Sequence, residues 1–412
     1  MANGRLLRLV RLAAACTAAG LAAAAVAARA EDGDDLKVYV LTLGPHEYPF
    51  YKFGHNAILV QRQDGDGEVF DFGNFAFHQP DLIAKLLRGR FQYWLSVGSV
   101  AETLHSYQAA NRTIEAQELD LTPAQRWGLL SRLRDNALPE NRGYLYDYFW
   151  DNCSTRVRDA VDAAVGGRVK GAGAAPGTMT LRDHVLRMTS NLLWEYVGLH
   201  FSLGKVTDAL PSVWQEAFLP EKLRDLLRLV RIERDGALVP LIKSERMIFA
   251  AQRLPPPARP PSRAPWFAAI GLALGGVMAG LGWLGRDRRA ARAALGALSA
   301  LLGSVLGMLG LLLLLLWAAT NHRAAHANAN ISLCAPWTIA LLPVSVGVAV
   351  GSEGAKRVAF WIAASALALA VAGLAAKVLP GPSQDNAAFL ALLLPFWLGL
   401  TAGLWQLLPR AR

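Results

Sequence analysis

Cysteine and charged residues are scarce in this chain of 412 residues. Only three cysteines are present, and Asp, Glu, Lys and Arg together make up 18% of the chain, whereas 53% of it is hydrophobic. Acidic residues are fewer than basic ones, 32 against 42, so the formal net charge is +10. This composition excludes a disordered chain and an ordinary soluble protein, and it predicts a protein that meets a bilayer.

Several motifs of common enzyme classes are also missing. No G-x-S-x-G stands near a strand end, and no P-loop or G-x-G-x-x-G follows a predicted strand, which argues against serine hydrolases and nucleotide-binding enzymes. His46-Glu47 lacks the second histidine that a zinc-protease helix requires, so we expect no metal, and we expect no other cofactor. The basic excess lies in short loops between apolar runs, which argues against a nucleic-acid partner.

The hydrophobic excess is concentrated in the last third of the chain. Residues 264–412 carry ten Lys or Arg and three Asp or Glu, and they contain five apolar runs near or above the length that crosses a bilayer. We therefore predict a membrane domain over residues 265–412. Its spans are expected near residues 265–285, 294–319, 333–350, 358–379 and 388–408. Almost no ionisable residue lies inside a span, which argues against a transport pathway.

The first thirty residues are typical of a secretory signal peptide. Basic residues precede an Ala/Leu-rich stretch that ends in Ala28-Arg29-Ala30, a cleavage motif, so we expect residues 1–30 to be removed. An uncleaved anchor and a lipobox ending at Cys16 are the alternatives. Eight basic residues fall in the loops assigned to the cytoplasm, and four fall on the other side, of which Arg259 and Arg263 belong to the linker. Both signals predict an exported N-terminal domain and a cytoplasmic C-terminus.

Residues 31–253 predict one mixed α+β domain. Strand patterns occur at 37–43, 57–63 and 68–72, and an Asp-Gly-Asp-Gly turn signal stands between the last two. The helical patterns cover residues 80–89, 98–112, 122–136, 154–165, 180–190 and 220–230. A proline-rich linker at 254–264 then separates this domain from the membrane domain.

Cys153 is the cysteine that points to chemistry, because Cys16 leaves with the signal and Cys334 begins the third span. A polar stretch at 151–155 leads into an amphipathic run, so the thiol is expected at a helix N-terminus, which favours the thiolate. His55 opens a predicted strand beside a glycine and is our candidate base. A Cys153–Cys334 disulfide and a merely packed histidine are the structural alternatives.

A third group is expected to orient the histidine. Asp71 lies on the strand that pairs across the turn at 64–67 and is our first choice, with Asn74 and then Glu47 as alternatives. Backbone N–H groups of Cys153 and Ser154, or the side chain of Asn152, are candidates for an oxyanion hole.

Seven separated blocks of sequence are similar to one known family. They are residues 41–45, 53–57, 70–77, 87–94, 111–112, 139–142 and 146–156, and they include Phe-Gly-His-Asn-Ala and Asp-Asn-Cys-Ser-Thr. In this order they resemble the N-terminal periplasmic domain of Lnb-type lipoprotein N-acyltransferases, over most of residues 37–230. That domain is similar to papain-like and NlpC/P60-type cysteine folds in a permuted order, with the histidine strand before the cysteine helix.

The resemblance extends to a loop of the membrane domain. Either His322 or His326, together with Asn328 and Asn330, matches the family's H…N-x-N…P pattern, which implies that this loop contributes to the acyl or amine site. Helix capping and hydration of a short loop are the alternative role for these side chains. The fold that the resemblance implies is a permuted papain-like α+β domain followed by about five transmembrane helices. The location that it implies is the bacterial inner membrane, with the N-terminal domain in the periplasm and the C-terminus in the cytoplasm.

The resemblance also implies an activity, which is acyl transfer through a thioester on Cys153. The donor would be a phospholipid or another acylglycerol, and the acceptor would be the α-amine of the lipidated N-terminal cysteine of a lipoprotein. Two other classes stay open. One is a cell-wall amidase or peptidase, or a lipase, with the same Cys-His dyad; the other is a non-enzymatic envelope sensor or scaffold.

Overall fold

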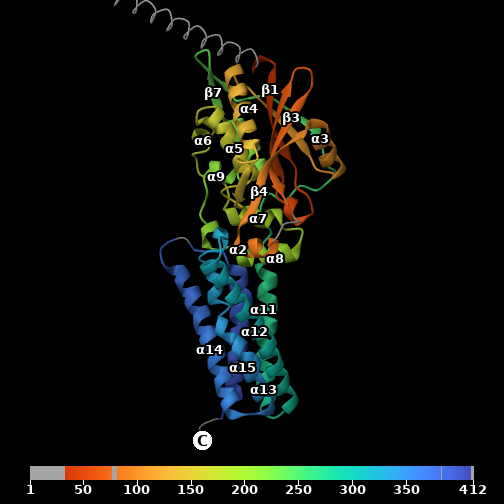
Figure 1. Cartoon of the computed structure of the whole chain (residues 1–412). Helices are drawn as coiled ribbons and strands as arrows, with labels where there is room; N and C mark the ends of the chain where they lie inside the picture. Colours follow the sequence, from red (N-terminus) through yellow and green to blue (C-terminus); the bar gives the residue numbers. More distant parts are fainter. Residues whose placement is uncertain (1–32, 77–80, 382, 410–412) are drawn as a thin grey trace, which may run out of the picture. The chain divides into compact units, whose positions relative to one another are not determined.

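The computed structural model describes residues 33–76, 81–381 and 383–409 (Figure 1). The predicted signal peptide and Cys16 therefore lie outside the described residues. The chain forms two compact units. One, here called the sheet unit, contains the chain up to Leu82 together with Phe91–Thr178 and Pro211–Pro255. The other, here called the membrane unit, contains Ile83–Arg90, Met179–Leu210 and the chain from Pro256 onward.

The division shows that the chain passes between the units more than once. The segments Ile83–Arg90 and Met179–Leu210 belong to the membrane unit, although sequence alone grouped them with the N-terminal domain. The proline-rich stretch at 254–264 lies where the chain leaves the sheet unit for the last time.

A seven-stranded antiparallel sheet is the frame of the sheet unit. Its strands in spatial order are β6 (Gly143–Tyr146), β4 (Phe91–Ser99), β3 (Gly67–Phe75), β2 (His55–Arg62), β1 (Leu36–Leu43), β5 (Ile114–Leu119) and β9 (Ile242–Phe249). The predicted turn joins β2 to β3, and the pairing sets Ile58 opposite Phe70. A separate hairpin is formed by β7 (Arg231–Arg234) and β8 (Ala237–Pro240).

Both faces of the central strands are covered, which explains why β1 and β2 are apolar at almost every position. On one face, alternate residues of β1 and β2 such as Leu41 and Leu59 pack toward Leu104 and Tyr107 of α3 (Val100–Ala109). On the other face, their neighbours pack against helices from later in the sequence. These include α4 (Pro123–Ala137), α5 (Cys153–Ala164), α6 (Arg168–Ala172), α9 (Val213–Glu216) and α10 (Pro220–Leu229).

Within the described residues, the membrane unit contains five segments that are long and apolar enough to cross a bilayer, as the sequence predicted. They are Ala264–Gly285 (α11), Arg289–Ala319 (α12), Ala329–Val350, Glu353–Val378 and Ala387–Gln406 (α15). The third is irregular: the 3-10 turns η4 (Ala329–Ser332) and η5 (Pro336–Ala340) precede α13 (Leu341–Val350). The fourth consists of α14 (Glu353–Ala375) and the turn η6 (Ala376–Val378).

Small residues let α11 and α15 pack closely. A Cβ on Gly271 would come within 2.5 Å of the Leu392 carbonyl oxygen, and Cβ atoms on Gly275 and Gly282 would overlap the backbone of Pro395 and Gly403. Glycine rows of this kind allow membrane helices to pack backbone against backbone. Short elements complete the unit: α2 (Leu82–Arg88), α7 (Leu181–Met188), α8 (Leu193–Ser202), η2 (Lys205–Thr207) and η3 (Arg323–Ala325).

Candidate active site

The thiol of Cys153 lies at the first residue of α5. Asn152 is the N-cap: its Oδ1 accepts the backbone N–H of Thr155 at 2.9 Å, and Thr155 Oγ1 accepts the backbone N–H of Asn152 at 2.7 Å. This capping box defines where the helix begins. The N–H groups of Cys153 and Ser154 therefore have no acceptor within the helix and form the positive end of its dipole, which stabilises a thiolate.

The imidazole of His55 comes from the first residue of β2. It follows Gly54, whose φ of 83° is a conformation that glycine adopts without strain. A Cβ at this position would also come within 2.9 Å of the Leu43 carbonyl oxygen. His55 Nε2 lies 2.7 Å from Oδ1 of Asp71 on β3. The same Oδ1 accepts the backbone N–H of Gly73 at 2.6 Å. The hairpin register thus brings our predicted orienting carboxylate to the histidine.

A bulge in β3 makes room for the ring. The pairing of β3 with β4 shifts between Asp71 and Asn74, and Gly73 lies in the shifted stretch. A Cβ on Gly73 would overlap Cε1 of His55 and would lie 3.1 Å from its Nδ1. Glycine is therefore the only residue that leaves the His55 ring in this position.

Ser154 and Asn56, which directly follow Cys153 and His55, are hydrogen-bonded to each other. Ser154 Oγ donates to Oδ1 of Asn56 at 2.8 Å, and the Asn56 amide donates to Leu41 O and Thr42 Oγ1, each at 3.1 Å. Ser154 and Asn56 are both fully buried. This brace sets the start of α5 against the start of β2, so that Cys153 and His55 meet.

The electrostatics of the site favour a thiolate–imidazolium pair. Burial alone would lower the pKa of His55, but the Asp71 carboxylate and the Cys153 thiolate outweigh it and hold that pKa well above its usual value. Burial alone would raise the pKa of Cys153, but the His55 charge, its hydrogen bond to the thiol and the Asn56 N–H lower that pKa. For Asp71, the opposing effect of burial is outweighed mainly by His55, which lowers the carboxyl pKa.

Aromatic side chains enclose the pair. Tyr107 of α3 stacks on the His55 ring with centroids 6.4 Å apart and an interplanar angle of 10°, and the buried Arg112 guanidinium lies 4.5 Å from the Tyr107 centroid. Tyr93 of β4 and Tyr146 of β6 stack at 4.2 Å. Burial and the nearby Cys153 thiolate raise the pKa of both phenols, so they stay neutral. These surroundings strengthen the charge interactions within the triad.

Two models of one protein family match the chain. The model of the Lnb N-terminal periplasmic domain matches residues 23–185, and the model of the Lnb transmembrane domain matches residues 270–408. The chain belongs to the Lnb family. The two matches follow the family order and together cover more than half of the sequence. Nothing matches the chain among curated proteins or among solved structures.

Membership of the Lnb family gives the coarse identity of the protein. It is a membrane protein with a periplasmic N-terminal domain, from a family associated with lipoprotein maturation. Cys153, His55 and Asp71 all lie within the match to the periplasmic domain.

Two accessory residues that we predicted have other partners in this Lnb chain. Both N–H bonds of the Asn152 amide are used, by Tyr148 O at 2.9 Å and by Phe218 O at 3.0 Å, so Asn152 anchors the helix start and its amide is not free to bind an oxyanion. Asn74 donates to Asp71 O and to Ser96 Oγ, which stabilises the bulge rather than the imidazole. Backbone N–H groups at the start of α5 remain the oxyanion donors that we expect.

The four residues predicted from the membrane loop belong to the membrane unit. His322 Nε2 lies 2.9 Å from Leu86 O, and His326 Nε2 lies 3.1 Å from Thr320 O. The amides of Asn328 and Asn330 both donate to Phe201 O at 2.9 Å, at the C-terminal end of α8. In this structure the two asparagines cap a helix end, which is the alternative role that sequence alone left open.

Both described cysteines are free thiols. Cys153 is partly exposed at the start of α5, and Cys334 is fully buried among apolar residues of the membrane unit. The disulfide between them, which sequence left open, is not formed in the structure. Sequence reasoning missed Gly73, Asn56, Tyr107 and Arg112, whose roles depend on contacts between distant segments.

Proposed function

We propose that this Lnb-family chain is a lipoprotein N-acyltransferase of the bacterial inner membrane. It moves an acyl chain, by way of a thioester on Cys153, to the α-amine of the lipidated N-terminal cysteine of a lipoprotein. Its C-terminus lies in the cytoplasm. The observation that supports this proposal best is the triad of Cys153, His55 and Asp71. The thiol lies at a helix start and is hydrogen-bonded to the imidazole, whose other nitrogen contacts the Asp71 carboxylate.

The first half-reaction forms the acyl-enzyme. The Cys153 thiolate attacks the ester carbonyl of a phospholipid or another acylglycerol, and the new C–S bond leaves a negative charge on the carbonyl oxygen. N–H groups at the start of α5 stabilise that oxyanion. When the intermediate collapses, the C–O bond breaks and the His55 imidazolium gives its proton to the leaving glycerol oxygen. The products are the thioester and a deacylated lipid.

The second half-reaction forms the amide. The neutral α-amine of the lipoprotein attacks the thioester carbonyl, and His55, now neutral, accepts the proton that the nitrogen loses. The C–S bond then breaks and returns the thiolate, which the imidazolium stabilises. Asp71 keeps one ring nitrogen of His55 occupied throughout, so the other nitrogen faces the reacting atoms.

Anchoring suits this reaction because both substrates are confined to a membrane surface. The apolar segments of the membrane unit hold the enzyme in the same surface, which raises the effective concentration of donor and acceptor at the site.

Mass spectrometry of a reporter lipoprotein tests the proposal. Cells that lack their own N-acyltransferase would carry the intact chain, its Cys153→Ala variant, its His55→Ala variant or, as a matched control, its Cys334→Ala variant. We expect an N-terminal amide with the intact chain and the control, and a free amine with the other two. A free amine with well-expressed intact protein would overturn the proposal. Release of free fatty acid or of cleaved wall peptide in that case would identify a lipase or an amidase.

A further inference from the structure

The helix α8 buries two polar side chains and leaves two large apolar side chains exposed at its start. Glu195 and His200 are 6% and 5% exposed, whereas Leu193 and Trp194 are 57% and 67% exposed. On a helix at the surface of a soluble domain, the exposed positions are mostly polar and the buried ones apolar, so these four residues depart from that pattern. Two adjacent large apolar side chains exposed beside buried polar ones indicate an apolar partner.

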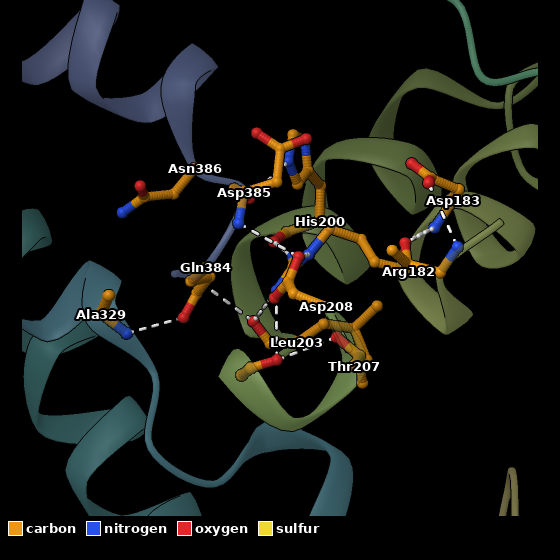
Figure 2. Close-up of polar contacts among 12 residues, drawn as sticks. Arg182, Asp183, His200, Leu203, Thr207, Asp208, Ala329, Gln384, Asp385 and Asn386 are labelled. Atoms are coloured by element: carbon orange, nitrogen blue, oxygen red, sulfur yellow. Dashed lines mark hydrogen bonds and ion pairs between the residues drawn. The ribbon is translucent and has the colours of Figure 1, made fainter. Parts of the chain in front are cut away.

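Polar contacts fix the buried side of α8 within the membrane unit. Arg182 of α7 donates to His200 O at 2.8 Å and forms an ion pair with Asp208, also at 2.8 Å. His200 Nε2 lies 3.2 Å from Asp385 O, and the Asp385 backbone N–H donates to Asp208 Oδ1 at 3.0 Å. Figure 2 shows these groups meeting the segment that leads into α15. The orientation of α8 is therefore held by specific bonds.

Aromatic contacts place α8 at one end of the apolar helices. The rings of His200 and Phe201 pack on Phe389 of α15, with centroids 5.0 and 5.2 Å away, and Phe267 of α11 packs on the same ring at 5.5 Å. Phe389 and Phe267 lie in the first turn of their helices. Because α11 and α15 are long and apolar enough to cross a bilayer, α8 packs at the end where such spans would enter the hydrocarbon.

The short helix α2 is held at the end of a neighbouring span. The Asn321 backbone N–H donates to Arg88 O at 2.9 Å, two residues after the end of α12, and His322 contacts Leu86 O. Ile83 and Leu87, one turn apart, are 72% and 64% exposed. The exposed cations Arg88 and Arg90 follow them. This is the composition of a helix that lies in a membrane surface, apolar toward the acyl chains and basic toward the headgroups.

We propose that α2 and α8 form an interfacial membrane-binding surface, here called the lipid face, defined by Ile83, Leu87, Leu193 and Trp194. These side chains insert into the phospholipid leaflet that surrounds the starts of α11 and α15. The face continues the apolar surface of the spans, where Trp266 in the first turn of α11 is 74% exposed, as aromatic residues at membrane boundaries often are. The inference does not depend on the reaction catalysed at Cys153.

Depth-dependent fluorescence quenching tests the lipid face in the full-length protein. In a background with the native cysteines replaced, Trp194→Cys and Leu87→Cys would each carry a nitrobenzoxadiazole probe in phosphatidylethanolamine–phosphatidylglycerol vesicles. Matched controls are Leu238→Cys on β8 and Trp361→Cys on α14, both at residues that are 68% exposed. We expect a nitroxide near the lipid headgroup to quench the probes at 194 and 87 several-fold more than the probe at 238.

The controls decide how each result counts. Quenching at 361 by a nitroxide deep in the acyl chain shows that the protein is inserted. If the probes at 194 and 87 are then no more quenched than the probe at 238, the inference is wrong and the face is covered by water or by protein. Leu193→Cys, at the neighbouring residue, supplies the same comparison if Trp194→Cys fails to assemble.

Discussion

Both units of the molecule bury charged groups, but the partners that stabilise these charges differ between the two units. In the membrane unit, the fully buried Arg182 is paired with Asp208 and also donates to the carbonyls of His200, Leu203 and Gly204 (Figure 2). In the sheet unit, Cys153 and His55 instead shift each other's pKa, and the thiol is partly exposed. The cluster around Arg182, here called the saturated cluster because several acceptors surround its guanidinium, holds loops together. The cluster around Cys153 leaves a reactive sulfur partly exposed, which suits it to chemistry.

The two thiols give the strongest test of this comparison. Replacing Cys153 by Ala removes the nucleophile, so acylation of a reporter lipoprotein should fall by at least about 10⁴-fold. Replacing the buried Cys334 by Ala should leave acylation of the reporter within about twofold of the intact protein, because that thiol faces only apolar neighbours. Mass spectrometry of the reporter measures both. Full activity of Cys153→Ala at equal expression would contradict the assignment of the nucleophile.

Removing the orienting carboxylate should weaken the charge pair without removing its members. In Asp71→Asn the pKa of His55 falls, because the negative charge that raised it is gone. The pKa of Cys153 rises, because the loss of imidazolium outweighs the smaller direct effect of removing the Asp71 charge, which by itself lowers the thiol pKa. We expect a rate loss of about 10²- to 10⁴-fold. The midpoint of Cys153 alkylation by iodoacetamide should move to higher pH. An unchanged midpoint would exclude the orienting role of Asp71.

A single methyl group at Gly73 should displace the His55 ring. The Cβ of Gly73→Ala overlaps the imidazole, and a shift of about 1 Å in a catalytic group costs roughly 10²-fold in rate. The matched control is Gly128→Ala in α4, where no atom lies within 4 Å of the new Cβ and where alanine favours the helix. Acylation rate and thermal unfolding are measured for both. Equal rates in the two variants would show that the ring position does not matter.

Breaking the saturated cluster should affect stability and leave the thiol unchanged. Arg182→Met strands the Asp208 carboxylate in a buried site, and such a loss costs about 3–5 kcal/mol. The double variant Arg182→Met/Asp208→Leu should recover much of that cost, since no unpaired charge remains. Thermal unfolding in detergent measures stability, and the alkylation midpoint of Cys153 should stay in place. A shifted midpoint would mean that the two clusters are coupled.

Local patterns predicted the elements whose signals lie within one segment. The hairpin of β2 and β3 follows from alternating apolar residues around an Asp-Gly turn, and all six helical patterns correspond to helices. The start of β2 was placed two residues late, at Ala57, because His55 and Asn56 are polar and interrupt the apolar run. The strand β5 was missed, and its partners are remote in sequence: β1 lies about seventy residues earlier, and β9 more than a hundred residues later. The strand β4 was missed as well, although it pairs with the preceding strand β3.

The candidate site shows the same limit. Residue chemistry pointed to Cys153 and His55, and the hairpin register pointed to Asp71, whose contact with His55 the structure shows. The brace between Asn56 and Ser154 and the space that Gly73 leaves arise only when β2, β3 and α5 meet. The passage of α2 and α8 into the membrane unit was not predicted: α2 was assigned to the N-terminal domain, and α8 was not among the predicted helices. The contacts that place them there, such as His322 with Leu86 O and His200 with Asp385 O, join segments remote in sequence.

The central claim is an acyl thioester on Cys153, and intact-peptide mass spectrometry tests it most directly. Purified full-length protein would be held in phospholipid vesicles without an acceptor, and the peptide containing Cys153 would then be analysed. We predict a mass increase of one acyl chain that neutral hydroxylamine removes, and that a lipidated lipoprotein peptide also removes while gaining the chain as an amide. Transfer to the acceptor with the Cys153 peptide unmodified, and equally fast in Cys153→Ala, would contradict the account.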